Sequence, residues 1–365
     1  MNLKSYLAWP GAPLAIASAA LFGASTPLAK ALLGDGVSPW LLAGLLYLGS
    51  GIGLAVIHYG RRLVGRPTGE AQLGRKDVGW MALVVLSGGV AGPLLLMIGL
   101  TTTAASTAAL LLNLEGLATM AIAWLVFREN VDRRLLLGAL AILGGALLLS
   151  WQPGQGFGGV GIGSLAIAGA CLAWGIDNNL TRKVSGSDPV QIAMIKGLVA
   201  GGVNLTLALS LGAKLPSLGL AAAAGVVGFL GYGVSLVLFV LGLRFLGTAR
   251  TGAYFSTAPF IGALLAIAMF GEALTIPLVL AAALMAVGLY LHLLERHDHD
   301  HVHEPLEHEH AHTHDDHHQH EHGPDDPAGE PHVHGHRHAR LIHGHPHYPD
   351  LHHRHGHEPE RTAQP

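Results

Sequence analysis

Residues 99–129 read GLTTTAASTAALLLNLEGLATMAIAWLVFRE, and residues 242–272 read GLRFLGTARTGAYFSTAPFIGALLAIAMFGE. Both stretches start with Gly-Leu, end on a glutamate and align without a gap. Further upstream, LAIASAALFG from Leu14 resembles LAIAGACLAWG from Leu165. The chain therefore contains an internal duplication, and this duplication restricts the folds that it can adopt.

The body of the chain is strongly hydrophobic. Half of the 365 residues are hydrophobic and only 12% are charged, which is about half the charged fraction of an average soluble domain. A helix needs roughly 20 consecutive apolar residues to cross the hydrocarbon core of a bilayer. We predict ten such spans, at 11–33, 37–59, 79–99, 103–126, 133–151, 161–182, 189–211, 218–242, 248–270 and 274–294.

The ten spans divide into two copies of five, residues 11–151 and 161–295. Because five is an odd number, the second copy must lie upside down in the membrane relative to the first. Inverted repeats of this kind are characteristic of secondary transporters, whose site lies near the bilayer midplane between the halves. We therefore predict an all-α membrane protein of ten transmembrane helices, arranged as two inverted five-helix repeats.

The basic residues support this topology. With the N-terminus inside, the outer ends and loops carry only Lys30 and Lys214, and the inner segments carry the others. Such a bias follows the positive-inside rule. It predicts a multi-pass protein of the cytoplasmic (inner) membrane with both termini in the cytoplasm. The inner basic residues are Lys4, Arg61, Arg62, Arg66, Arg75, Lys76, Arg128, Arg133, Arg134, Arg182, Lys183, Arg244, Arg250 and Arg296.

Residues 296–365 form a tail of different composition. All but two of the 25 His residues lie between His297 and His357, among Asp, Glu and Pro. A segment with so few large apolar residues cannot bury a core, so we expect the tail to be disordered. The formal net charge of -3 leaves no basic patch for nucleic acid. The single cysteine, Cys171, excludes disulfides and Cys-based zinc sites.

Two copies of a five-helix unit, each with a Gly-rich fourth helix ending in FRE or FGE, resemble the EamA-type transporters of the drug/metabolite transporter superfamily. The resemblance covers residues 11–295 and leaves out the added histidine-rich tail. It implies that small metabolites, amino acids or toxic compounds are carried by alternating access, without ATP. In this family the fourth and ninth helices often have a central proline. Pro259 matches that pattern, whereas its counterpart is Gly116, preceded by Glu115.

Glu115 is the strongest candidate for a functional residue. It lies about 12 residues into its span, roughly 18 Å deep at 1.5 Å per residue, with Asn113 and Thr119 nearby. An ionisable group at this depth costs several kcal/mol and marks a functional site by default. We favour Glu115 as a carrier of a proton or another cation. The alternative is a neutral or paired carboxyl that holds helices together.

A second polar cluster, WGIDNNLTRK, spans Trp174–Lys183. Asp177, Asn178 and Asn179 lie one to two turns from the inner end of the sixth span, and Lys196 lies at a similar depth in the seventh. Because these spans are antiparallel neighbours, we expect Asp177 and Lys196 to form an ion pair. The pair is either an inner gate that breaks when the site faces inward, or a structural pair that neutralises both charges.

Three other polar residues carry weaker expectations. Tyr254 is a candidate for lining a cavity. Lys30 is expected to extend its ammonium group to the outer interface. Glu272, at the end of a helix, is expected to be a solvated carboxylate.

The tail is expected to bind divalent metal. Neutral imidazole suits Zn, Ni, Co and Cu(II), with carboxylates as further ligands. The alternating spacing shows no single four-ligand frame, so we expect several weak, interchangeable sites that lose metal as the imidazoles protonate near about pH 6. The candidate ligands are His308, His310, His312, His314, His317, His318, His320 and His322.

We predict a secondary-active exporter of small organic metabolites or drugs, coupled to protons through Glu115, and not an enzyme. No cofactor is required, and the expected partners are the lipid bilayer, a small-molecule solute, divalent metal ions at the tail and no nucleic acid. A homodimer is left open. One alternative is a Ni, Co or Zn exporter, and another is a membrane-anchored metal buffer or sensor. The residues expected to contact the solute or coupling ion are Glu115, Asn113, Thr119, Trp174, Asp177, Asn178, Asn179, Lys196 and Tyr254.

Overall fold

The structure is a computed structural model of the chain. It describes residues 11–64, 72–127, 133–151, 161–181, 184, 187–239, 241–242, 251, 254–293, 297–303, 307–312, 332–337 and 341–347. The described body is all-helical, which confirms the predicted fold class. Its elements are α2 (Gly11–Gly34), α3 (Pro39–Leu63), η1 (Arg75–Asp77), α4 (Val78–Val84), η2 (Val85–Ala91), α5 (Gly92–Thr102), α6 (Ala105–Leu111), α7 (Leu114–Phe127), α8 (Arg133–Ser150), α9 (Ile162–Thr181), α10 (Pro189–Ser210), α11 (Leu218–Gly228), η4 (Phe229–Val234), α13 (Ala258–Phe270) and α14 (Ile276–Leu293).

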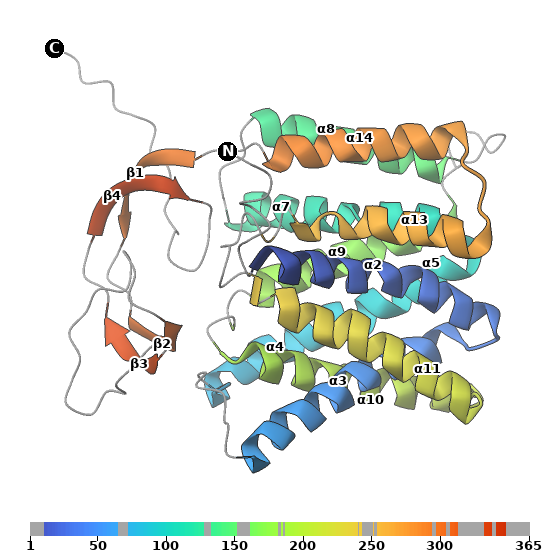
Figure 1. Ribbon diagram of the computed structural model, residues 1–365, viewed down its shortest axis with the longest axis horizontal. Coiled ribbons are helices and arrows are strands. Elements are labelled where there is room, and N and C mark those ends of the chain that lie inside the picture. The colour runs from blue at the N-terminus through green and yellow to red at the C-terminus, as the bar shows by residue number, and fades with distance from the viewer. Residues whose placement is uncertain are drawn as a thin grey trace.

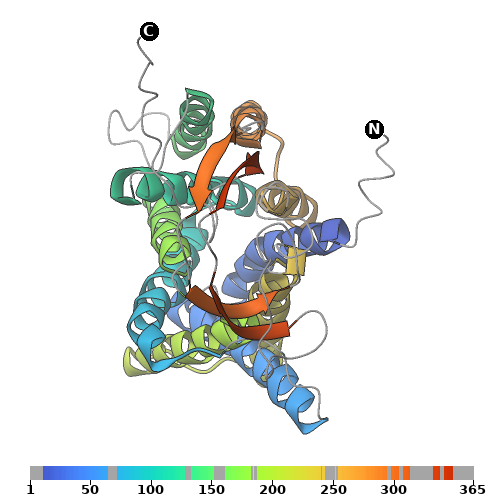
Figure 2. The ribbon, with the colours of Figure 1, turned by 90° about the vertical axis from the view of Figure 1, so that its left-hand side faces the viewer.

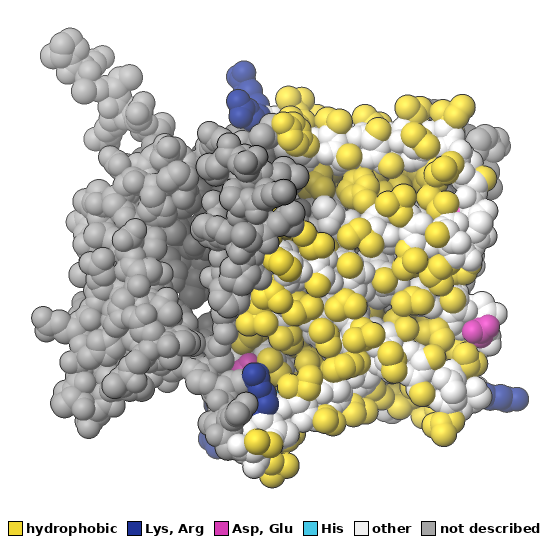
Figure 3. All heavy atoms as spheres, viewed as in Figure 1, with side chains coloured by type: hydrophobic (Ala, Val, Ile, Leu, Met, Phe, Trp, Pro, Cys, Tyr) yellow, Lys and Arg dark blue, Asp and Glu magenta, His cyan; other side chains and the backbone are white. Residues whose placement is uncertain are grey.

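Most of these helices are suited to a bilayer. Within the described residues, seven helical segments are long and apolar enough to cross a membrane, and α13 and α14 are shorter apolar helices. The helix α9 has a comparable length, but its polar end at 177–179 lowers its mean hydropathy. In Figure 3, the side of the bundle is covered by hydrophobic side chains, and charged groups are confined to its two ends.

The helices run roughly along one direction, and Figure 1 shows the start of α2 and the end of α14 at the same end of the bundle. We call this the proximal end and the opposite one the distal end. A chain that crosses the membrane an even number of times begins and ends on the same side, as the predicted ten spans require. The distal end therefore holds the connections from α2 to α3, from α5 to α6 and from α13 to α14.

The two copies start equivalent helices with equivalent signals. Pro39 occupies the first turn of α3, and the Ser38 side chain accepts a hydrogen bond from the Leu41 N–H. Pro189 does the same in α10, where the Asp188 side chain accepts from the Val190 N–H at 2.8 Å. Proline is favoured at this position because its missing N–H has no helical partner there.

Helices of the two copies approach closely where glycines face one another. A Cβ atom added to Gly197 of α10 would lie 2.6 Å from the Gly51 nitrogen of α3, and one added to Gly262 of α13 would lie 2.6 Å from the Gly23 carbonyl oxygen of α2. Small residues allow this approach, which supplies much of the packing energy between helices in lipid.

The pair α8 and α14 forms a separate layer. In Figures 1 and 2 the two helices lie side by side at one edge of the bundle. A Cβ atom added to Gly288 of α14 would lie 2.6 Å from the Gly138 carbonyl oxygen of α8. A Cβ atom added to Gly145 of α8 would lie 2.8 Å from Met285 Cγ. The last helices of the two copies thus pack chiefly on each other.

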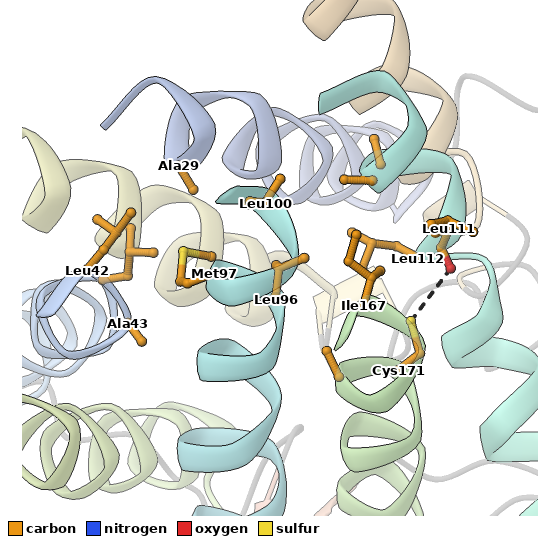
Figure 4. Packing of buried hydrophobic residues seen from close by; sticks show 14 of the residues in the cluster. Ala29, Leu42, Ala43, Leu96, Met97, Leu100, Leu111, Leu112, Ile167 and Cys171 are labelled. Carbon is orange, nitrogen blue, oxygen red and sulfur yellow. Dashed lines mark hydrogen bonds between the residues drawn. The ribbon is translucent and has the colours of Figure 1, made fainter. Parts of the chain in front are cut away.

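The main hydrophobic core lies on the distal side of the polar residues. Leu96, Met97 and Leu100 of α5 are fully buried against Ala29 of α2 and Leu42 of α3, as Figure 4 shows. These side chains join the first three spans of the first copy. The core therefore fixes the frame on which the polar residues of α7, α9 and α10 are held.

Several spans are interrupted near their middle, which the sequence did not predict. The fourth span breaks at 112–113 between α6 and α7, and a turn at 256–257 precedes α13 in the ninth. The third and eighth spans each contain a π-helical turn, η2 and η4. Such turns widen the helix and are frequent at functional sites.

The described parts of the tail contain four short strands. They are β1 (His297–His303), β2 (Glu307–His312), β3 (His332–Arg337) and β4 (Leu341–His347). The strand β1 pairs with β4, and β2 pairs with β3, both in antiparallel register. An isolated two-stranded ladder is only marginally stable in water, so these ladders do not amount to a packed domain.

Candidate functional site

Glu115 lies at the first turn of α7, directly after the break in the fourth span. It follows Ala105, where the span begins, by roughly 15 Å at 1.5 Å per residue. That places it near the middle of the 22-residue span Ala105–Val126. The break exists because Leu112 and Asn113 form a turn, and their N–H groups donate to Ala109 and Leu110 carbonyls at 3.2 and 3.1 Å.

The Glu115 carboxylate belongs to a cluster of three polar side chains. The Asn178 amide of α9 donates to Glu115 Oε1 at 3.0 Å and to Thr119 Oγ1 at 3.2 Å. The Thr119 hydroxyl donates to the Glu115 carbonyl at 2.9 Å. The structure thus brings together Glu115, Thr119 and Asn178, from two helices of different copies.

The exposure of this group indicates what it faces. Glu115 is half-buried and Asn178 is exposed, although both lie within membrane spans. A carboxylate or amide that faces lipid is costly, so polar side chains at this depth face the bundle interior or a water-filled cavity. Glu115 and Asn178 therefore form a polar part of the surface that α7 and α9 present.

Asp177 and Lys196 form an ion pair, as the sequence suggested. Lys196 Nζ donates to Asp177 Oδ2, and the Thr181 hydroxyl donates to Asp177 Oδ1 at 3.1 Å. The Asp177 side chain is only 5% exposed and that of Lys196 is 15% exposed. Both residues are within electrostatic range of Glu115. Whether the pair acts as a gate stays a prediction.

The π-helical turn η2 packs against the side of α9 that carries Trp174 and Asp177. The Gly88 carbonyl accepts from the Tyr47 hydroxyl at 2.8 Å and from Trp174 Nε1 at 3.0 Å. The Gly89 carbonyl accepts from the Asn204 amide at 3.1 Å. Because Gly88 has no side chain, Asp177 packs directly against its Cα. One glycine thus positions both Trp174 and the ion pair.

Asn179 belongs to the packing between α7 and α9. Its amide donates to the Thr119 carbonyl at 3.1 Å and to the Gly175 carbonyl at 2.8 Å. Within the described part of the chain, Asn179 Oδ1 and Asn204 Oδ1 are buried without a hydrogen-bond partner. Buried acceptors are normally satisfied, so these two oxygens are exceptions in the packing between the helices.

Two candidates lie apart from this cluster. The Asn113 amide donates to the Leu110 carbonyl at 2.8 Å and contacts Met285 Sδ of α14 at 3.8 Å. Tyr254 is half-buried just before α13, and its carbonyl accepts from the Thr257 hydroxyl at 2.6 Å. No hydrogen bond among the described residues joins either one to Glu115.

Sequence reasoning missed a row of aromatic rings that crosses between the copies. The ring centroids of Tyr47 and Tyr232 are 5.5 Å apart, those of Tyr232 and Phe22 are 6.0 Å apart, and those of Phe22 and Phe255 are 5.3 Å apart. Tyr47 and Phe22 belong to the first copy, whereas Tyr232 and Phe255 belong to the second.

The tail candidates are only partly described. His308, His310 and His312 alternate along β2, opposite His336, His334 and His332 of β3. The candidates His314, His317, His318, His320 and His322 lie outside the described residues. Within the part of the chain that the structure describes, no group of three or more His, Cys, Asp or Glu is arranged to hold a metal ion.

Comparisons with known proteins agree with this architecture. A protein named "Uncharacterized transporter" from Methanothermobacter thermautotrophicus is 29% identical over 289 residues, which cover 76% of this chain and 84% of that protein. A solved chain titled "Crystal structure of protein" matches with a TM-score of 0.57 at 19% identity and covers 77% of this chain and 96% of that one. This second likeness concerns the fold alone.

The family comparison identifies both copies. The EamA-like transporter family matches residues 9–151 and again residues 161–294. The two matches cover the helical body and leave out the histidine-rich tail. The chain therefore belongs to the EamA-like transporter family, whose members are multi-pass membrane proteins that transport small solutes and are not enzymes.

Proposed function

We propose that the protein is a secondary-active exporter of small organic metabolites or drugs. It works by alternating access and is coupled to protons through Glu115. The observation that carries this proposal is the contact of Glu115 with Asn178 and Thr119 at the break of the fourth span. Discontinuous helices near the bilayer midplane are where secondary transporters hold substrate and coupling ions.

The charges of the site favour a proton as the coupling ion. Asp177 is already neutralised by Lys196, which makes its carboxylate a poor ligand for a divalent cation. The Glu115 carboxyl group has the Asn178 amide as its neighbour, and an amide can hydrogen-bond to a carboxyl group in either protonation state. A proton that binds and leaves therefore changes the charge of the site without removing the contacts that position it.

The proposed orientation places the proximal end, and with it the tail, in the cytoplasm of a cell with a cytoplasmic (inner) membrane. The tail binds Zn, Ni, Co or Cu(II) through neutral imidazoles and loses the metal as they protonate near about pH 6. Its metal state then regulates the transporter from the side on which the solute is taken up.

Glu115→Gln is the decisive variant. Glutamine keeps the oxygen that accepts from Asn178 but removes the proton site, so the fold should survive while coupling is lost. Wild type and variant would be reconstituted in liposomes with an imposed pH gradient. They would be screened with labelled amino acids, nucleosides, cationic dyes, zinc and nickel. We expect flux of at least one organic solute to follow the gradient in the wild type only.

The control is Asp35→Asn, the same chemical change at an exposed acid between α2 and α3. It should leave the flux unchanged. Gradient-driven flux that persists in Glu115→Gln would contradict the proton-carrier role. Flux of zinc or nickel without any organic solute would support the metal exporter instead. No flux of any probe, together with metal binding by the tail, would support the buffer or sensor.

A further inference from the structure

Glu272 is not the solvated carboxylate that the sequence suggested. It lies between α13 and α14 at the distal end and is half-buried. Its Oε1 accepts from the Ala105 N–H at 2.8 Å, and its Oε2 accepts from the Ser106 N–H at 3.0 Å and from the Ser106 hydroxyl. Three donors thus converge on one carboxylate. Hydrogen bonds to an ionised group are roughly twice as strong as neutral ones.

Lys30 binds the α5 side of the same connection between α5 and α6. Its Nζ donates to the Leu100 carbonyl and, at 3.0 Å, to the Thr103 carbonyl, at the distal end of the bundle. These carbonyls end α5, whereas Glu272 binds the N–H groups that start α6. A cation at a helix C-terminus and an anion at a helix N-terminus both match the helix dipoles. Lys30 and Glu272 are also within electrostatic range of each other.

The carboxylate joins the two copies. Ala105 and Ser106 belong to the first copy, and Glu272 belongs to the second. Below this contact, α6 packs on α13, and a Cβ atom added to Gly262 would lie 3.2 Å from Ala109 Cβ. The distal ends of the two copies are therefore closed against each other through α6 and the connection from α13 to α14.

We propose that Glu272, Ser106 and Lys30 form a distal latch, and that its release opens the transport pathway at the distal end. This inference rests on the proposed alternating-access function, in which each end must open in turn. Glu272 acts as a positioning residue, because it holds the α5–α6 connection and touches no part of the Glu115 cluster. While the latch is closed, a solute near Glu115 has no exit at the distal end.

The chain contains its own reporter for opening. Cys171 of α9, the single cysteine, is 1% exposed, and its Sγ contacts the Leu111 carbonyl at the end of α6 at 3.6 Å. Figure 4 shows this contact beside the core residues Leu112 and Ile167. Since the latch holds the start of α6 and Cys171 touches its end, movement of α6 away from α9 uncovers the thiol.

The test uses the full chain in sealed membrane vesicles of both orientations. A membrane-impermeant sulfonated maleimide is applied to the distal side, and the rate of Cys171 labelling is measured by mass spectrometry. Glu272→Gln replaces one carboxylate oxygen by an NH2 group that faces the Ser106 N–H, donor against donor. We expect labelling to be at least roughly tenfold faster in this variant, given the strength of hydrogen bonds to charged groups. Ser106→Ala, which removes one donor, should give a smaller increase.

Asp35→Asn is the matched control, because it removes an exposed carboxylate from the same end without touching the latch. It should label as slowly as the wild type. A second readout is hydrogen exchange of the peptide that covers 103–109, whose Ala105 and Ser106 amides donate to Glu272. Exchange should rise in Glu272→Gln and stay unchanged in Asp35→Asn.

The results separate this inference from the function on which it rests. If labelling and exchange both stay at the wild-type level in Glu272→Gln, while the thiol labels normally after unfolding, the latch is overturned. An equal increase in Asp35→Asn would overturn it as well, since the effect would be one of surface charge. Neither readout needs a transported solute. A flux screen that finds no solute therefore counts against the transporter proposal and not against the latch.

Discussion

Removing one partner of the Asp177–Lys196 pair should destabilise the protein strongly, whereas removing both should not. The two side chains are 5% and 15% exposed, so each would remain nearly desolvated without its partner. Breaking a buried ion pair from one side costs about 3–5 kcal/mol, while replacing both partners by neutral groups of similar shape is often neutral. Because the Lys196 side chain is slightly exposed, we expect about 3 kcal/mol for each single variant.

The choice of substitutions follows from the packing around Gly88. Asp177 lies so close to the Gly88 Cα that a methyl group would not fit between them. A lysine at position 177 would therefore clash for steric reasons, and charge reversal is a poor test. Asp177→Asn keeps the shape and the oxygen that accepts from Thr181, and Lys196→Met keeps most of the side-chain length. The double variant should lie within about 1 kcal/mol of the wild type.

The assay is equilibrium unfolding in mixed detergent micelles, followed by tryptophan fluorescence. Trp174, one turn before Asp177, donates to the Gly88 carbonyl and reports on this region. The interaction energy from the double-mutant cycle should exceed about 2 kcal/mol. Single variants that each cost under about 1 kcal/mol and add in the double variant would refute the reasoning, because the pair would then be solvated or absent.

Three further outcomes are expected. Gly197→Ala should lower the free energy of unfolding by about 1–3 kcal/mol, because its new methyl group meets the α3 backbone. Gly202→Ala on the same helix has nothing within 4 Å of its new methyl group and should be neutral or slightly stabilising in the same unfolding assay. Trp174→Phe should lower the free energy of unfolding by about 1 kcal/mol, the contribution of its hydrogen bond to Gly88. It should also slow solute flux in liposomes, and unchanged flux would exclude Trp174 from the pathway. Deleting 296–365 should abolish zinc binding in calorimetry but retain flux, and loss of flux with intact unfolding behaviour would show that the tail is required for transport.

The helical, membrane-spanning body was predictable because a membrane span is a length-and-composition signal, and the inversion was inferred from the odd number of helices predicted for each copy. The Asp177–Lys196 pair was predictable as well, since two charges at equal depth in neighbouring antiparallel spans have few other partners. Each of these inferences uses only residue type and distance along the chain.

What escaped prediction depends on the backbone. The hydropathy of residues 103–126 is the same whether Leu112 and Asn113 continue a helix or form a turn. The break before Glu115 therefore cannot be predicted from hydropathy. The role of Glu272 was hidden for a related reason, because its partners include backbone N–H groups, which every residue but proline possesses. The contact of Asn178 with Glu115 depends on the rotation of two helices, which hydropathy does not report.

The separate layer of α8 and α14 has a consequence for how the protein is made. Gly138 and Gly145 face a helix that begins only at Ile276, so the ribosome must finish nearly the whole second copy before α8 meets its partner. Until then, α8 waits at the edge of an incomplete bundle with its glycine-lined face turned to lipid or to the insertion machinery. The first copy by itself therefore leaves the face of α8 that packs on α14 without its partner. A chain that stops before α14 would leave that face uncovered and become a target for quality-control proteolysis.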